Sequence, residues 1–223
     1  MYLEINFKNE ETVVDSFRRI AKTLFSDYVL IVNETRYRLL DLEFYCYAEN
    51  QFEDPYAHKH NHQLTNGKWY SHGSGLDITF GNGIDHGGIL IRAIAEIDKA
   101  ASKENLFLKK EVHGPLNVKT EILSNLNGAF SEALNTFYLA DISKDKQGAL
   151  MIEPNYVIET SRIGLNGKND LSENQKFYKG NFRYVIFPHL KLKNKTQLAI
   201  DMKRQFEEMS NEEINKIFGS KFL

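Results

Sequence analysis

Polar and hydrophobic residues alternate between Leu40 and Glu49, and this spacing predicts a β-strand. One face of the strand carries the hydrophobic residues Leu40, Leu42, Phe44, Cys46 and Ala48. The opposite face carries Asp41, Glu43, Tyr45, Tyr47 and Glu49. Because this second face sets a carboxylate between aromatic rings, it is more typical of a pocket wall than of a surface exposed to solvent.

The chain ahead of this strand has a helical hydrophobic period over Asn9–Asp27, with acidic residues in the first turn. An apolar strand at Tyr28–Val32 and a turn at Asn33–Thr35 are expected to follow. These elements lead directly into the alternating strand. The sequence therefore predicts a helix, a strand, a turn and the pocket strand in that order.

Glycine is concentrated after the pocket strand, where residues 67–88 hold seven of the fourteen glycines. Short strands are expected at Lys68–His72 and Leu76–Phe80. The run Gly88–Ile97 is nearly all apolar, which favours a strand that is buried on both faces. Arg92 lies in the middle of this run and needs a partner, because an unpaired buried charge is strongly destabilising.

The C-terminal half predicts further elements. A strand followed by a turn is expected over Val157–Leu165, and Ser210 with Glu213 forms a capping-box pattern ahead of a short helix. Neither an internal repeat nor a linker composition divides the chain, so residues 1–223 are interpreted as a single domain. A helix is also predicted over Val118–Leu134, with an apolar face made of Ile122, Leu123, Leu126, Ala129, Phe130 and Leu134.

Composition narrows the class of protein. A content of 42% hydrophobic and 26% charged residues is ordinary for a soluble globular protein. The net charge of −2 gives no overall nucleic-acid signature, although a local basic patch remains compatible with it. The single cysteine, Cys46, excludes a disulfide framework and favours the reducing cytoplasm. The sequence has no signal-peptide pattern and no apolar run of about 18 residues, so no membrane span is expected.

Two interpretations of Glu43 and Arg92 are open. In the first, they form a structural ion pair between two strands, since such pairs also occur away from functional sites. In the second, Arg92 holds Glu43 ionised and oriented, so that the carboxylate activates a water molecule as a general base. Tyr45 would then supply a surface for stacking.

Histidine recurs after the pocket strand, at His58, His60, His62, His72 and His86. Zinc sites combine several histidines with a carboxylate, which raises a metal-site hypothesis. However, Asp54–Pro55 indicates a loop, in which alternate spacing fixes no ligand geometry, and no HExxH motif is present. The glycines form neither a GxGxxG pattern nor a P-loop. We therefore expect no metal and no other cofactor.

The region Lys176–Arg204 holds eight lysines and arginines against a single acid, Asp201. Basic residues interleaved with aromatic rings can track a nucleic-acid backbone. The alternative is a half-exposed strand whose lysines, Lys191, Lys193 and Lys195, face solvent. The interleaved rings are those of Phe177, Tyr178, Phe182, Tyr184 and Phe187.

With these residues in view, the chain resembles the mammalian-type alkyladenine (3-methyladenine) DNA glycosylase family over most of its length. Leu-Ile-Arg-Ala-Ile and Glu-Phe-Tyr are the most specific matches. The similar segments, in chain order, are AKTLFSDYVLIVNETRYRLLDLEFY, DPYAHKH, GKWYSHGSGLDITFG, GGILIRAIAEI, HGPLNV and RIGLNGKNDLSENQKFYKGN.

The resemblance implies a role for each matching residue. Glu43 falls on the catalytic glutamate, and Arg92 on an arginine that helps to hold the nucleophilic water. Ile163 falls where a backbone carbonyl completes the coordination of that water. Tyr45 falls on an aromatic residue that stacks on the flipped base, and His58 on a histidine that contacts the base edge.

The resemblance also implies an α+β fold, in which a single compact domain is built on a curved, mainly antiparallel sheet with flanking helices. The implied activity is metal-free hydrolysis of the N-glycosidic bond of a modified purine in DNA, as in base excision repair. Nucleic acid is the expected partner, with no membrane and no obligate protein partner.

The chain departs from the family at one turn. Ser74–Leu76 stands where the family has a tyrosine that fills the place of the flipped nucleotide, and His72 replaces a pocket tyrosine, with Tyr70 two residues before it. Duplex DNA, single-stranded DNA, RNA and a free nucleotide or nucleoside therefore remain open as substrates. A non-catalytic nucleic-acid-binding module is the further alternative.

Overall fold

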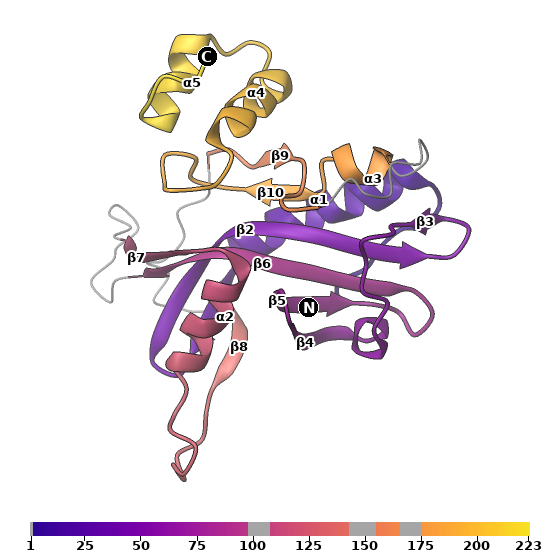
Figure 1. The fold of residues 1–223 in the computed structure, drawn as a ribbon, viewed down its shortest axis with the longest axis vertical. Coiled ribbons are helices and arrows are strands. Elements are labelled where there is room, and N and C mark those ends of the chain that lie inside the picture. Colours follow the sequence, from indigo (N-terminus) through magenta and orange to yellow (C-terminus); the bar gives the residue numbers. More distant parts are fainter. Residues whose placement is uncertain (1, 98–107, 143–154, 166–174) are drawn as a thin grey trace.

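One curled antiparallel sheet organises the computed structural model, which describes residues 2–97, 108–142, 155–165 and 175–223 (Figure 1). The main path of the sheet is β4-β5-β6-β2-β1-β8; β7 adds to β6, β3 and β10 add to β2, and β9 pairs with β10. The strands are β1 (Tyr28–Val32), β2 (Thr35–Ala48), β3 (Phe52–Glu53), β4 (Asn66–His72), β5 (Gly75–Phe80), β6 (His86–Ile97), β7 (Leu108–His113), β8 (Phe137–Asp141), β9 (Ile158–Thr160) and β10 (Arg183–Val185).

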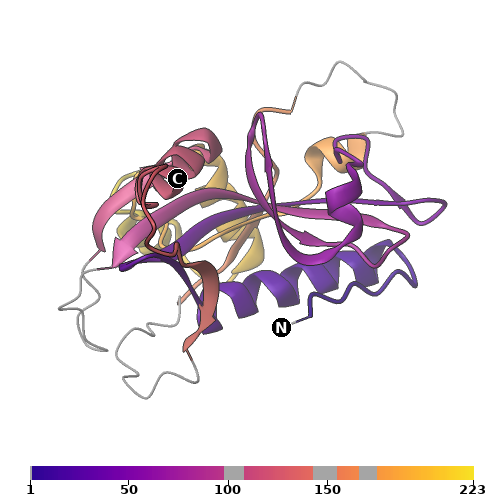
Figure 2. The same cartoon turned by 90° about the horizontal axis from the view of Figure 1, so that it is seen from below.

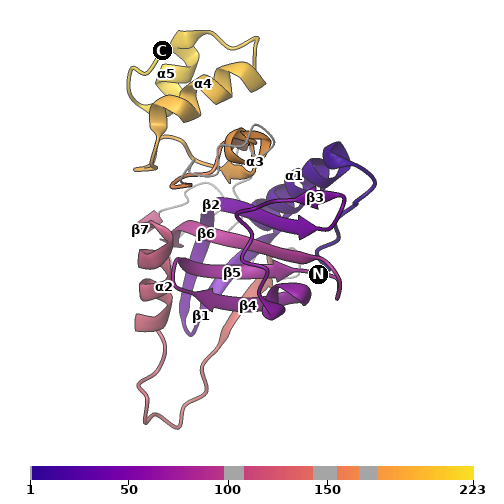
Figure 3. The same cartoon turned by 45° about the vertical axis from the view of Figure 1, so that its right-hand side comes forward.

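Helices flank this sheet, and Figure 2 shows α1 along one side of it and α2 on the other. The two C-terminal helices, α4 and α5, pack beyond β9 and β10 (Figure 3). The helices are α1 (Glu10–Asp27), α2 (Pro115–Ser124), α3 (Gln175–Lys179), α4 (Lys195–Gln205), α5 (Asn211–Phe218) and a short 3-10 helix, η1 (Asn61–Leu64).

The long pairing of β2 with β6 is the spine of the sheet, and a β-bulge interrupts it between Leu39 and Asp41. The pairing places Glu43 opposite Leu90. Gly88 of β6 permits a close approach from β5 and η1, because a Cβ there would lie 2.5 Å from an Asp77 carboxylate oxygen. The glycine-rich segment thus brings polar side chains of neighbouring elements against the spine.

The hydrophobic core lies between α1 and the sheet. Phe17 of α1 is fully buried, and its ring stacks on Phe44 of β2 with centroids 4.8 Å apart. The rings of Phe52 and Phe182 meet Phe17 edge-on. Asn9 caps the helix and accepts a hydrogen bond from the backbone N–H of Thr12. The predicted helix over Asn9–Asp27 is confirmed to within one residue.

The sheet curls until its two end strands meet. Trp69 of β4 stacks on Phe137 of β8, with ring centroids 4.3 Å apart and the ring planes 20° from parallel. The result is a half-barrel with flanking helices, and the predicted α+β class with a curved antiparallel sheet is confirmed.

The predicted helix over Val118–Leu134 is wrong in its C-terminal half. Helix α2 begins at Pro115 and ends at Ser124, and the following segment is a projecting loop (Figure 1). Leu123, Phe130 and Leu134 are 58%, 102% and 91% exposed, so they form no buried face. The helix ends at Ser124 although the apolar spacing continues, because contacts with the rest of the fold decide the structure of this segment.

Asn33 is the residue that closes this loop. Its side-chain amide donates to the carbonyl of Asn125 (2.8 Å), and its side-chain oxygen accepts from the N–H of Thr136 (2.9 Å). The two ends of the loop are therefore held beside the β1–β2 turn. Asn127 and Gly128, which are poor helix formers, lie within the loop.

The basic C-terminal region is not the lysine strand of the second sequence-based interpretation, and three of its five interleaved rings are buried. Residues 188–194 form turns and bends, so the alternative of a half-exposed lysine strand is wrong. Phe177, Phe182 and Tyr184 are buried in the core and cannot stack on bases.

The capping box of Ser210 with Glu213 is confirmed at the start of α5. In the helices that the structure describes, no segment is long and apolar enough to cross a membrane.

Candidate functional site

Glu43 is a fully buried carboxylate on β2 that accepts three hydrogen bonds. Its Oε2 accepts from the Arg92 guanidinium (3.0 Å) and from the Tyr45 hydroxyl (2.8 Å). Its Oε1 accepts from the backbone N–H of Ile163 (2.7 Å). Residues from β2, β6 and the loop after β9 thus converge on a single carboxylate.

Arg92 of β6 is the partner expected from the sequence, and it holds more than one group. Besides Glu43, its Nη1 lies 3.4 Å from the carbonyl oxygen of Ile163, and its Nε lies 3.9 Å from a carboxylate oxygen of Asp41. Asp41 is itself bound by Arg183 through two contacts of 2.8 Å. The network fixes the Arg92 guanidinium between two acids and a backbone carbonyl.

Tyr45 lies between Glu43 and a second arginine. Its hydroxyl donates to Glu43, and the guanidinium of Arg162 lies 4.4 Å from the centre of its ring. Burial and the neighbouring Glu43 charge raise the pKa of Tyr45 well above its usual range. The hydroxyl therefore stays protonated, and it remains a hydrogen-bond donor to the carboxylate.

A cavity of about 390 Å³ opens over this network. Glu43 lies behind the cavity wall, while its three hydrogen-bond partners line the cavity. His58, from the connection between β3 and η1, also lines it. The lining side chains that argue for a site are Tyr45, His58, His72, Asp77, Arg92 and Ile163.

His72 and Asp77 form a buried pair in this wall. The Nε2 of His72 lies 3.0 Å from Asp77, and the Nδ1 accepts from the backbone N–H of Ser74 (3.2 Å). Gln63 donates to the other Asp77 oxygen (3.2 Å). Both ring nitrogens of His72 therefore have partners, which fixes the orientation of its ring in the cavity.

Of the two histidines that line the cavity, His58 is the one whose ring has no hydrogen bond to another described residue. Its ring meets that of His72 edge-on, with centroids 4.5 Å apart. Burial and the neighbouring His72 lower the pKa of His58 below 6.5. His58 is therefore neutral at pH 7 and can either donate or accept a hydrogen bond.

Tyr70 lies in the cluster but not in the cavity wall. Its ring stacks between His60 and His72, at centroid distances of 4.8 and 5.1 Å. Burial and Asp77 raise its pKa. Tyr70 thus supports His72 from behind. No group of three or more His, Cys, Asp or Glu residues that could hold a metal ion occurs in the described ranges.

Sequence reasoning missed several residues of this site. Asp77 lies inside an apolar run, a pattern that signals a partnered buried acid. Arg162 and Asp54 form a fully buried ion pair beside Tyr45. Arg162 directly precedes Ile163, so the Arg-Ile-Gly sequence was the available signal. Asp54 belongs to the Asp-Pro segment that was interpreted only as a loop.

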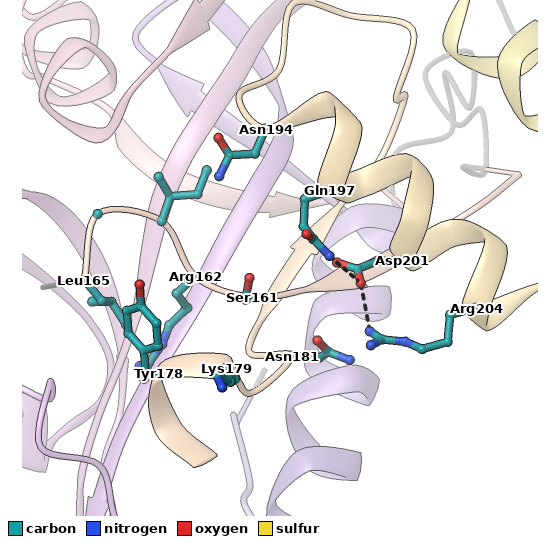
Figure 4. Close-up of a pocket in the computed structure, with 12 residues that line it drawn as sticks. Ser161, Arg162, Leu165, Tyr178, Lys179, Asn181, Asn194, Gln197, Asp201 and Arg204 are labelled. Carbon is teal, nitrogen blue, oxygen red and sulfur yellow. Dashed lines mark hydrogen bonds and ion pairs between the residues drawn. The ribbon is translucent and has the colours of Figure 1, made fainter. Parts of the chain in front are cut away.

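A second cavity, of about 440 Å³ (Figure 4), shares lining residues with the first. Both are lined by Ile163, Gly164 and Leu165. The other walls of this second cavity come from α3 and from α4, along which Gln197, Asp201 and Arg204 line it. Residues 166–174, which continue the Arg-Ile-Gly segment, lie outside the described residues.

Comparison with known proteins adds little to this geometry. No protein-family model matches the chain. An uncharacterized protein of Acanthamoeba polyphaga mimivirus is 26% identical over 217 residues, an alignment that covers 82% of this chain and 92% of that protein. The function must therefore be argued from the site.

Proposed function

We propose that this protein is an N-glycosidase that hydrolyses the bond between a modified purine and its sugar in nucleic acid. The observation that carries the proposal is the buried pair of Glu43 and Arg92, which lies directly behind the wall of a 390 Å³ cavity. Cavities of about 300–1,000 Å³ are typical of small-molecule sites. The glycosylase resemblance at these same residues supports the assignment.

The proposed mechanism places one water molecule on Glu43, at the acceptor site that its three described donors do not occupy. A carboxylate has about four lone-pair sites, and three donors occupy sites on Glu43. The remaining site would accept a proton from water as the water oxygen attacks the sugar C1′. The C1′–N bond breaks as the C1′–O bond forms, and the electron pair of the broken bond leaves with the base.

The charge of Glu43 has a second role in this mechanism. The sugar acquires positive charge as the bond to the base breaks, and a fixed nearby carboxylate stabilises that charge. Burial strengthens the interaction, because water no longer screens it. Arg92 and Ile163 would keep the carboxylate oriented and close to the incoming water.

The cavity wall would hold the base. The target base has to leave its stack to reach such a site. His58 would contact the base edge with its free ring nitrogen, while Tyr45 and the fixed His72 ring bound the space. The protein would act in the cytoplasm on DNA repair substrates, as the single cysteine and the resemblance favour.

The substitution Glu43→Gln tests the proposal with oligonucleotides that contain ethenoadenine or hypoxanthine. Base release should fall by about 10²–10⁴-fold, the usual contribution of a general base. Circular dichroism should show the native fold. Glu53→Gln, in an exposed carboxylate of β3, is the matched control and should retain release. Release at the wild-type rate by Glu43→Gln would refute the assignment.

A second function, a non-catalytic nucleic-acid-binding module, is favoured by one observation. Glu43 is fully buried and already bound by three donors, as in a structural ion pair. This alternative predicts binding with a steep salt dependence and no base release from any substrate. A free nucleoside or nucleotide hydrolysed faster than every oligonucleotide would instead indicate a glycosidase outside DNA repair.

A further inference from the structure

The second cavity is continuous in its lining with the proposed base pocket. Ile163, Gly164 and Leu165 line both, while the adjacent residues Lys193 and Asn194 line one cavity each. Gly164 has a φ of +79°, and a Cβ built there would meet no atom within 4 Å. At Gly164 the shared wall is therefore bare backbone, which a ligand that extends out of the base pocket can approach closely.

This cavity gathers polar side chains that have no hydrogen-bond partner among the described residues. Ser161, Tyr178, Asn181 and Asn194 line it, and none of their side chains forms a hydrogen bond with another described residue. Figure 4 shows them around the same space, although they come from three separate segments. Such a set matches a ligand with several acceptor oxygens.

The balance of charge around the cavity is positive. Lys179 is exposed, and its only polar contact among the described residues is the neutral side chain of Gln175 at 3.4 Å. Arg204 is 58% exposed and uses one terminal nitrogen on Asp201 (2.9 Å). That leaves its other donors open to a ligand.

Asp201 is the single carboxylate in the lining, and its oxygens are already occupied. One accepts from Thr160, and the other accepts from Gln197 and from Arg204. The dashed lines in Figure 4 show the last two contacts. The acid therefore positions cationic and amide groups at the cavity edge and does not neutralise Lys179.

The start of α4 adds to the positive charge around the cavity. Asn194 adopts a left-handed conformation (φ 60°) at the N-cap and gives no side-chain cap to the helix. The first-turn N–H groups are thus left without a side-chain acceptor, at the end of the helix where anions are stabilised. Asn194 and Gln197 both line the cavity, so this helix end borders it.

We propose that the second cavity binds a backbone phosphodiester of the nucleotide next to the one in the base pocket. The inference rests on the proposed function, because it takes the occupant of the first cavity from it. It also narrows that function, since it makes the substrate a polynucleotide and not a free nucleoside. Lys179 and Arg204 would pair with the phosphate, and the neutral side chains would donate to its oxygens.

Oligonucleotide binding tests this inference separately from catalysis. We would measure the affinity of full-length protein by fluorescence anisotropy, in the Glu43→Gln background, across a salt series. The double variant Lys179→Ala/Arg204→Ala should bind about tenfold more weakly and lower the slope of log affinity against log salt by about 1. Lys216→Ala/Lys221→Ala, which removes two exposed lysines of the C-terminal helix and tail, is the matched control and should do neither.

A modified ligand distinguishes a phosphodiester from a free phosphate ion. An oligonucleotide with a neutral methylphosphonate beside the target base should bind Glu43→Gln protein about tenfold more weakly, and the added double substitution should then have little further effect. The inference would be overturned if the cavity variant and the control variant lost equal affinity. It would also be overturned if the losses from the methylphosphonate and from the double substitution were additive. Base release from nucleosides without oligonucleotide binding would also overturn it, while the glycosidase proposal would stand.

Discussion

Two buried ion pairs border Tyr45, and they differ in how many contacts join the acid to its arginine. Arg162 and Asp54 are both fully buried, and they meet through two nitrogen–oxygen contacts. Arg162 also donates to the carbonyls of Phe44 and Phe177, at 2.9 Å each. Burial works against its charge, but Asp54 outweighs this and raises the pKa of Arg162.

Glu43 and Arg92 form the other pair, which is joined by a single contact of 3.0 Å. The Arg92 side chain is 9% exposed and lines the first cavity, while Glu43 lies behind the cavity wall. Arg162 lines the second cavity, and its buried Nε has no hydrogen-bond partner among the described residues. Buried charge beside a cavity is therefore common to both pairs, and the number of contacts within each pair distinguishes them.

Arg162→Ala should have the largest effect on stability. It leaves Asp54 buried without its cation, and removal of one partner of a buried pair typically costs about 3–5 kcal/mol. Urea denaturation would measure the change in the free energy of unfolding. Lys22→Ala, at an exposed position of α1, is the control and should change it by no more than about 0.5 kcal/mol. A loss below 1 kcal/mol for Arg162→Ala would remove the distinction between the pairs.

Arg92→Met should destabilise the protein less, by about 1–3 kcal/mol. Glu43 loses its cation but keeps the Tyr45 hydroxyl and the Ile163 N–H as donors. The same denaturation experiment checks this, and base release should fall together with it if the pair is catalytic. A loss as large as that of Arg162→Ala would show that both pairs are structural.

The contrast also shows what the sequence could predict. Alternation placed Glu43 and Tyr45 on one face of a strand, and the lone Arg92 in an apolar run required a partner. The Glu43–Arg92 pair was therefore predictable from the sequence. The Asp54–Arg162 pair was not, because these residues are 108 positions apart and lie in irregular segments without a hydrophobic period. Long-range contacts between loops leave no local pattern.

The same limit explains the errors in helix and pocket prediction. The apolar period of Val118–Leu134 was real, but Asn33 and the pairing of β8 with β1 draw the chain into a loop after Asn125. Tyr70 was expected in the pocket because it alternates with His72. Neighbouring rings instead enclose Tyr70 behind His72, and only the packing of η1 decides that.

Tyr45→Phe should reduce the free energy of unfolding by less than either arginine substitution. It tests the residue that lies between the two ion pairs. It removes one hydrogen bond to Glu43 and retains the ring under Arg162, so we expect a loss of about 0.5–1.5 kcal/mol. Tyr138→Phe, in a side chain that is 51% exposed, is the control and should leave stability unchanged. A Tyr45→Phe protein as stable as the wild type would mean that the hydroxyl is not needed to hold the carboxylate.

The smallest expected effect on stability comes from the titration of His58, which lines the same cavity as Arg92. Its pKa in the folded protein lies below 6.5, so as pH falls through 6.5 the unfolded chain takes up the proton first. Its contribution to stability is therefore present above pH 6.5 and is lost below it. Because the ring is largely exposed, we expect no more than about 0.5 kcal/mol.

Proton NMR of the imidazole ring would measure this pKa directly. His72→Asn should raise the His58 pKa toward 6.5, because it removes the neighbouring ring that contributes to lowering it. His189→Asn, at an exposed position, should leave it unchanged. If His58 titrates at or above 6.5 in the wild type, burial in the cavity does not control its charge. The Glu43–Arg92 pair would then lie beside a solvated histidine and not beside a neutral one suited to contact a base.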